Sequence, residues 1–176
     1  MLVSVFFFWG FVAAGNTILI PVFKKSLDLE QWQAQLIEFC FYVAYAVGAL
    51  AYYLIGRARG KDVLNTIGYK NGLSLGLLIS AFGAFLFLPA ASYESFPLML
   101  TGLFIVGVGF SLQQTAANPL AISLGSKETG SSRLSMAGGV NNVGTTIAPI
   151  ILSYAIFGST GTAENTTLSL ASVKMP

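Results

Sequence analysis

The sequence predicts an all-α polytopic membrane protein. Three observations support this fold class: 55% of the 176 residues are hydrophobic, only 9% are charged, and the mean hydropathy is +0.73. Soluble domains carry a charge on roughly a quarter of their residues, so a water-soluble fold is excluded. Backbone polar groups find no water inside a bilayer, so long apolar runs must cross it as helices.

Five apolar runs are each long enough to cross about 30 Å of hydrocarbon at a rise of about 1.5 Å per residue. The first run has no basic start and no cleavage site, so we interpret it as a spanning helix and not as a signal peptide. Polar, turn-forming segments separate the runs and predict the connections. The predicted spanning helices cover residues 1–23, 34–55, 73–91, 96–124 and 134–157.

Two local patterns concern structure rather than function. Asp28 and Gln31 fit a capping box that opens the second helix. In the third run, small residues recur every four positions and predict close approach to a neighbouring helix. These residues are Gly72, Gly76, Ser80 and Ala84.

The basic residues predict the orientation in the membrane. Six lie in the connections after the second and fourth spans, and three lie on the opposite side. Because basic residues favour the cytoplasmic side, we expect a multi-pass protein of the cell inner (plasma) membrane with a cytoplasmic N-terminus. The six are Arg57, Arg59, Lys61, Lys70, Lys127 and Arg133, and the three are Lys24, Lys25 and Lys174.

The C-terminal segment predicts that the chain is a fragment. Residues 158–176 are rich in Ser, Thr, Gly and Ala, and we interpret them as an external loop that leads to a missing sixth helix. Five spans followed by such a loop are typical of an incomplete polytopic protein.

The inventory of reactive side chains excludes several functions. The chain has no histidine, one cysteine (Cys40) and a net charge of +2. We therefore expect no catalytic residues, no metal site, no cofactor and no nucleic-acid partner. A membrane-embedded enzyme would need a cluster of titratable groups, which this chain lacks.

Polar residues within the spans predict a transporter. The first and fourth spans each contain an amide cluster followed by a proline, at Asn16 to Pro21 and at Gln113 to Pro119. Two repeated three-helix units with discontinuous helices around a midplane site give this pattern. The alternative is that the amides only join helices to each other.

Glu38 is the only carboxylate well inside a predicted span. It lies about 6 Å past Ala34 along a helix. Such an acid is a candidate proton or cation site, and the alternative is an interfacial glutamate whose side chain extends toward the headgroups.

Several motifs together resemble the fucose/glucose/galactose permease branch of the major facilitator superfamily. The most specific is Gln114-Thr115-Ala116-Ala117-Asn118-Pro119, followed by Arg133-Leu134 and Asn141. Other matching segments are Phe6 to Phe11, Asn16 to Pro21, Gln33 to Ile37 and Ile67 to Gly72. The resemblance runs along the whole chain.

The resemblance implies a twelve-helix transporter with two six-helix halves, each a pair of inverted three-helix repeats. It implies that a monosaccharide such as fucose, glucose or galactose is moved by alternating access with ion symport. This chain would hold five helices of the first half, so its partners are the sugar, the lipid bilayer and a missing C-terminal half. The residues expected to hydrogen-bond the sugar are Asn16, Gln114, Asn118, Asn141 and Asn142. The rings of Trp9, Phe41 and Tyr45 are expected to stack on the sugar or to face lipid.

Two departures from the family pattern concern the coupling ion. In the proton-coupled fucose permease pattern an aspartate follows the first-span Asn and a glutamate precedes Thr-Ala-Ala-Asn-Pro. Here those positions are Thr17 and Gln114, which do not titrate near neutral pH. Three options stay open: proton coupling through Glu38, sodium binding by oxygens such as those of Thr17 and Asn16, or uncoupled transport. A non-transporting scaffold or sensor with the same fold is the alternative function.

Overall fold

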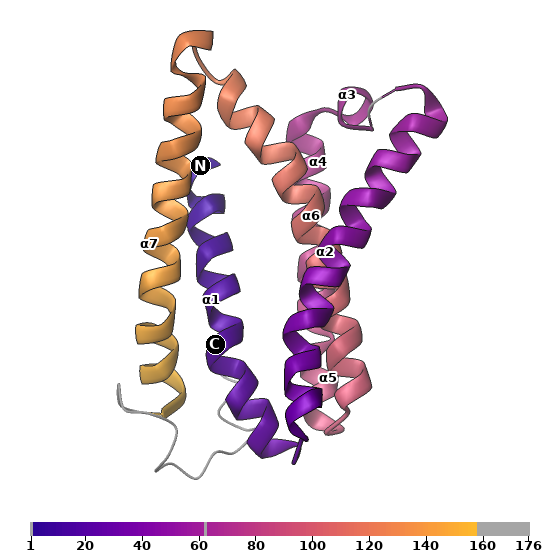
Figure 1. The fold of residues 1–176 in the computed structure, drawn as a ribbon, viewed down its shortest axis with the longest axis vertical. Helices are drawn as coiled ribbons and strands as arrows, with labels where there is room; N and C mark the ends of the chain where they lie inside the picture. The colour runs from indigo at the N-terminus through magenta and orange to yellow at the C-terminus, as the bar shows by residue number, and fades with distance from the viewer. Residues whose placement is uncertain (1, 62, 158–176) are drawn as a thin grey trace. The chain divides into compact units, whose positions relative to one another are not determined.

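The computed structural model describes residues 2–61 and 63–157, and every regular element in these residues is helical (Figure 1). This confirms the all-α fold class. The described residues form two compact units, 2–38 with 135–157 and 39–61 with 63–134. Within these described residues, four helices have the length and apolar composition needed to cross a membrane: Leu2–Lys25, Gln31–Arg59, Tyr69–Ser92 and Phe96–Ser123.

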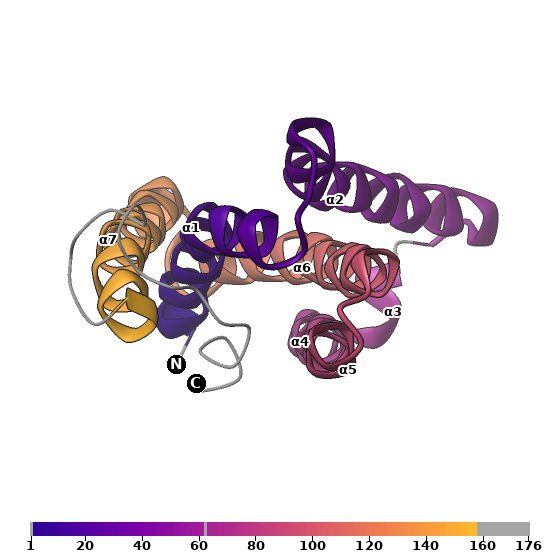
Figure 2. The ribbon, with the colours of Figure 1, turned by 90° about the horizontal axis from the view of Figure 1, so that it is seen from below.

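In the first unit, α1 (Leu2–Ser26) and α7 (Gly130–Phe157) lie side by side in both ribbon views (Figures 1 and 2). Gly10 of α1 lies directly against a backbone carbonyl of α7, and Gly144 of α7 lies against one of α1. The two backbones touch there because neither residue has a side chain. Among the described residues α7 is not one of the four helices above, so its crossing of the membrane stays a prediction.

One half of a capping box begins α2 (Gln31–Arg59). The backbone N–H of Glu30 donates to Oε1 of Gln33 at 2.8 Å, which is one half of such a box. Asp28 instead has a φ of 48°, in the left-handed region that commonly follows the end of a helix. The predicted box at Asp28 and Gln31 is therefore wrong by two residues.

In the second unit, α6 (Phe96–Ser123) lies between α2 and the pair α4 (Tyr69–Phe85) and α5 (Phe87–Ser92) (Figure 2). Gly76 of α4 faces Gly109 of α6, where a Cβ on Gly109 would lie 2.7 Å from the Gly76 carbonyl oxygen. Only glycines allow this approach, so the expected close packing of the third run is confirmed.

The row of small residues that α4 buries differs from the predicted row at the C-terminal end of the helix. Gly72, Gly76 and Gly83 are buried and Ser80 is half-buried, whereas Ala84 is exposed. A period of four residues drifts around a helix that has 3.6 residues per turn, so the contact face returns to Gly83 and not to Ala84.

A short helix, α3 (Val63–Ile67), lies in the connection that the sequence predicts as a polar turn. Leu64 is buried in it and packs with Leu112 and Ala116 of α6. Ile67 of α3 also packs against this cluster, so two apolar side chains tie the connection to the core of the second unit.

Three helices continue through an internal proline, so the predicted discontinuous helices are wrong for the described residues. These prolines are Pro21 in α1, Pro119 in α6 and Pro149 in α7. Proline has no N–H, so the carbonyl four residues earlier loses its usual partner. That earlier residue is a threonine each time, and its hydroxyl donates to a carbonyl of the preceding turn. The threonines are Thr17, Thr115 and Thr145.

Arg133 holds the turn between α6 and α7, which contains the 3₁₀ helix Lys127–Thr129. Its Nε donates to the Ala121 carbonyl at 3.0 Å, and its Nη2 donates to the carbonyl of Ile122. Nη2 also donates to the Ser126 carbonyl at 3.0 Å. The last carbonyls of a helix have no partner within it, so the guanidinium of Arg133 caps α6.

Candidate functional site

Asn141 joins the two helices of the first unit. Its Nδ2 donates to the backbone carbonyl of Phe6 at 3.0 Å, and the side chain is half-buried. This bond gives Asn141 the helix-joining role that is the alternative to sugar binding. Among the described residues no other group bonds to this carboxamide, so its oxygen can still accept a hydrogen bond from a ligand.

Three further candidates belong to the first unit. Asn142 is exposed on α7, and the side chain of Asn16 lies outside the described residues. Thr17 is exposed, and its Oγ1 donates to the Ala14 carbonyl of its own helix at 2.7 Å. The hydroxyl oxygen keeps its lone pairs, which is what a hard cation such as sodium requires of a ligand.

Glu38 is exposed and lies farther from its helix start than the sequence predicts. The helix α2 begins at Gln31 and not at residue 34, so Glu38 lies about 10 Å along it at about 1.5 Å per residue. Its role in ion coupling stays a prediction.

The adjacent glutamines of α6 face different neighbours. Gln113 is 1% exposed, and its Nε2 donates to the Gly76 carbonyl at 3.1 Å and to Ser80 Oγ at 2.8 Å. Gln113 is thus a buried link to α4. Consecutive residues lie about 100° apart around a helix, so Gln114 points away from α4.

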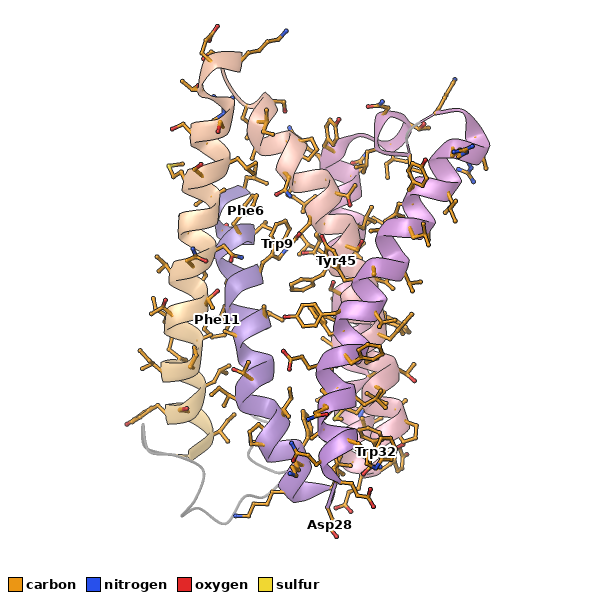
Figure 3. All side chains as sticks on the ribbon, in the orientation of Figure 1. Phe6, Trp9, Phe11, Asp28, Trp32 and Tyr45 are labelled. Atoms are coloured by element: carbon orange, nitrogen blue, oxygen red, sulfur yellow. The ribbon has the colours of Figure 1, made fainter. Side chains whose placement is uncertain are left out.

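Gln114 is held by a tyrosine of α2. The hydroxyl of Tyr45, which Figure 3 labels, donates to Gln114 Oε1 at 2.8 Å, and both side chains are half-buried. Asn118 lies one turn farther along the same face of α6 and is also half-buried. Two predicted substrate residues thus lie on one face of α6, and Tyr45 contacts one of them, Gln114.

Sequence reasoning missed the hydrogen bond of Tyr45, for which it expected only stacking or lipid contact. Its partner, Gln114, is 69 residues away in the sequence, so no local sequence pattern predicts the bond. The other two candidate rings are buried and pack on aromatic neighbours. The ring centroids of Trp9 and Phe6 lie 4.7 Å apart, and those of Phe41 and Phe110 lie 5.6 Å apart. Figure 3 labels Trp9 and Phe6 on α1.

The candidate residues are divided between the two units. A single cavity lined by all of them stays a prediction. Among the described residues, no group of three or more His, Cys, Asp or Glu side chains gathers where it could hold a metal ion. The first unit holds Asn16, Thr17, Glu38, Asn141 and Asn142, and the second holds Gln114 and Asn118.

Comparison with known proteins places this fold in a family. Residues 1–153 match the Major Facilitator Superfamily. The chain is 39% identical over 158 residues to the glucose/galactose transporter of Brucella abortus, covering 90% of this chain and 36% of that protein. It is 37% identical over 150 residues to the L-fucose-proton symporter of Escherichia coli, covering 85% of this chain and 32% of that protein.

A solved structure gives the same result. The crystal structure of the Escherichia coli fucose:proton symporter matches with a TM-score of 0.71 and 33% identity, over 89% of this chain and 35% of that protein. The chain therefore spans about a third of the length of these relatives. These relatives are transporters and not enzymes. Sequence and fold agree over most of its length, and the chain belongs to the Major Facilitator Superfamily.

Proposed function

We propose that the chain is part of a secondary active transporter that moves a monosaccharide, such as glucose, galactose or fucose, by alternating access with ion coupling. The names of the relatives support the substrate class. Because the chain spans 36% and 32% of two of them, the proposal concerns the transporter that this chain forms with a complementary C-terminal half.

The pair Gln114 and Asn118 carries the proposal. Half-buried amides in an apolar helix are costly unless they meet a partner, and intramembrane polar groups commonly mark a substrate path. A carboxamide offers both a donor and an acceptor, as a sugar hydroxyl does. We propose that this pair binds the sugar, together with Asn16, Asn141 and Asn142.

Sugar uptake into membrane vesicles tests the proposal. Radiolabelled glucose, galactose and fucose are supplied to vesicles that contain the chain alone or together with the remaining part of the Brucella abortus transporter. We expect uptake above that of vesicles without the chain, and about a tenfold higher KM for Gln114→Ala and for Asn118→Ala.

Each other outcome is informative, provided that blotting shows the chain in the membrane. The transporter proposal fails if neither arrangement takes up any of the three sugars. Sugar binding without uptake would favour the scaffold or sensor. Unchanged uptake in both variants would remove the pair from the sugar site.

We propose Glu38 and Thr17 as the candidate coupling groups. Glu38 is an exposed carboxylate on a candidate spanning helix, and Thr17 supplies a hydroxyl oxygen. Uptake is measured with a pH gradient and, separately, with a sodium gradient. Loss of the pH effect in Glu38→Gln would support a proton site, and loss of the sodium effect in Thr17→Val would support a sodium site. Uptake that ignores both gradients would indicate uncoupled transport.

We also propose that the chain lies in the inner membrane with a cytoplasmic N-terminus. The basic and exposed connection after α2, which contains Lys61, supports this orientation. In a Cys40→Ser background, Lys25→Cys and Lys61→Cys are exposed to a membrane-impermeant maleimide from outside spheroplasts. We expect labelling of Lys25→Cys and not of Lys61→Cys, and the reverse pattern would overturn the orientation.

A further inference from the structure

We infer that Tyr45 is a positioning residue that fixes the Gln114 carboxamide as a hydrogen-bond donor toward the sugar. The inference rests on the proposed function, because it concerns how Gln114 meets its substrate. Its basis is the bond of 2.8 Å between the Tyr45 hydroxyl and Gln114 Oε1.

The bond determines which end of the amide remains for a ligand. Oε1 of Gln114 accepts from Tyr45, so the amide nitrogen with its two hydrogens points away from the tyrosine. Within the described part of the chain, this is the only bond of the Gln114 carboxamide. A carboxamide without a partner can offer either its oxygen or its nitrogen to a ligand, whereas the carboxamide of Gln114 offers the N–H donors of its nitrogen. The sugar group that meets Gln114 must therefore accept, and we assign that role to a hydroxyl oxygen.

Helix packing holds Tyr45 in place from the α2 side. One residue before it, the Ala44 Cβ lies 2.8 Å from where a Cβ on Gly107 would be. Three residues after it, a Cβ on Gly48 would lie 3.0 Å from the Ser111 Cβ. The backbones of α2 and α6 thus meet on both sides of Tyr45, and two packed helices set the position of its hydroxyl.

Packing also fixes Gln114 from the α6 side. The preceding residue, Gln113, is bonded to α4, and the Oγ1 of Thr115 donates to the Ser111 carbonyl at 2.8 Å. Both neighbours are already engaged with the protein, so neither can replace the amide of Gln114. A rotation of α6 that moved Gln114 away from Tyr45 would break the buried bonds of Gln113.

The first test compares two tyrosines of the same helix. Tyr45→Phe removes the bond to Gln114, and the matched variant Tyr52→Phe removes a bond of 3.2 Å to the Val108 carbonyl of α6. We expect Tyr45→Phe to raise the KM for sugar about 3- to 10-fold at constant Vmax, and Tyr52→Phe to leave KM unchanged. An equal rise in both variants would show that only helix packing matters and would overturn the inference.

A double-mutant cycle asks whether Tyr45 acts through Gln114. We expect Tyr45→Phe to have no further effect on KM in a Gln114→Ala background, because the group that it positions is gone. Effects that multiply in the double variant would mean that Tyr45 acts independently, and they would overturn the positioning role.

Sugar analogues test the donor assignment directly. A fluorine in place of a hydroxyl can accept a hydrogen bond but cannot donate one, and a hydrogen in that place can do neither. We expect one hydroxyl position at which the fluoro analogue competes with sugar several-fold better than the deoxy analogue, and we expect Tyr45→Phe to lose this difference. Equal competition by both analogues at every position would overturn the inference.

Different results would contradict the proposed function and the positioning role of Tyr45. If the unsubstituted protein takes up no sugar, the proposed function is wrong and the inference falls with it. If it takes up sugar and Tyr45→Phe behaves identically, the proposed function stands and only the inference is wrong.

Discussion

The Nδ2 of Asn141 donates to the backbone carbonyl of Phe6 at 3.0 Å, and this bond joins α7 to α1. It lies beside Gly10, which rests against the backbone carbonyl of Asn141 itself. One residue thus contributes its side chain to the hydrogen bond and its backbone to a close contact between the two helices. A hydrogen bond between membrane helices stabilises them by about 0.6–2 kcal/mol.

Asn141→Ala is expected to lower the free energy of unfolding by about 0.6–2 kcal/mol, because it removes the bond to Phe6. The neighbouring variant Asn142→Ala is the control, since that side chain is exposed, and we expect no change from it. Circular dichroism during denaturant titration in detergent micelles measures both. Equal losses would contradict the joining role of Asn141.

Gly144→Ala is expected to destabilise the protein by about 1–3 kcal/mol, because the added Cβ would press against the Phe7 carbonyl and lie 3.0 Å from the Phe11 backbone nitrogen. Gly138 lies on the same helix with nothing within 4 Å of its Cβ position. Gly138→Ala should therefore stabilise by about 0.5–1 kcal/mol through helix propensity. Thermal melting distinguishes the two signs, and a neutral Gly144→Ala would show that the helices can separate at no cost.

Gln113→Ala is expected to lower the free energy of unfolding by about 1–3 kcal/mol, because it leaves buried partners on α4 without their donor. Gln114→Ala should cost less stability and should affect uptake instead. Melting and sugar uptake are measured side by side for both variants. If the two glutamines exchanged these behaviours, the assignment of the α6 faces would be wrong.

Arg133→Ala is expected to loosen the turn after α6, because the guanidinium is its main hydrogen-bond donor. A protease that cuts after lysine should cleave at the exposed Lys127 several-fold faster in this variant. Arg57→Ala, which removes an exposed charge elsewhere, serves as the control. Unchanged cleavage at Lys127 would mean that the backbone alone holds the turn.

Much of the fold could be predicted because lipid leaves the chain few choices. The run predicted for 96–124 is the helix Phe96–Ser123, since an apolar segment without water must form all its hydrogen bonds internally. The short helix Val63–Ile67 was missed, because it depends on the apolar contacts of Leu64 and Ile67 inside a polar segment. Contacts of that kind come from tertiary packing and have no periodic signal.

The candidate site was predictable by residue type but not by partner. The sequence indicates that amides at Gln113, Gln114 and Asn141 matter, yet it does not separate those that join helices from those left for a ligand. That distinction depends on rotation about the helix axis and on which distant helix lies opposite. Gln113 meets Ser80, whereas its neighbour Gln114 meets Tyr45.

The internal prolines affect the mechanics of the helices that contain them. At Pro21, Pro119 and Pro149 one rung of the hydrogen-bond ladder is already missing, so bending there sacrifices nothing further. Each of these weak points lies within about two turns of an amide residue. Helix bending therefore costs the least free energy near the polar residues. The apolar ends of these helices can move as rigid segments about the prolines.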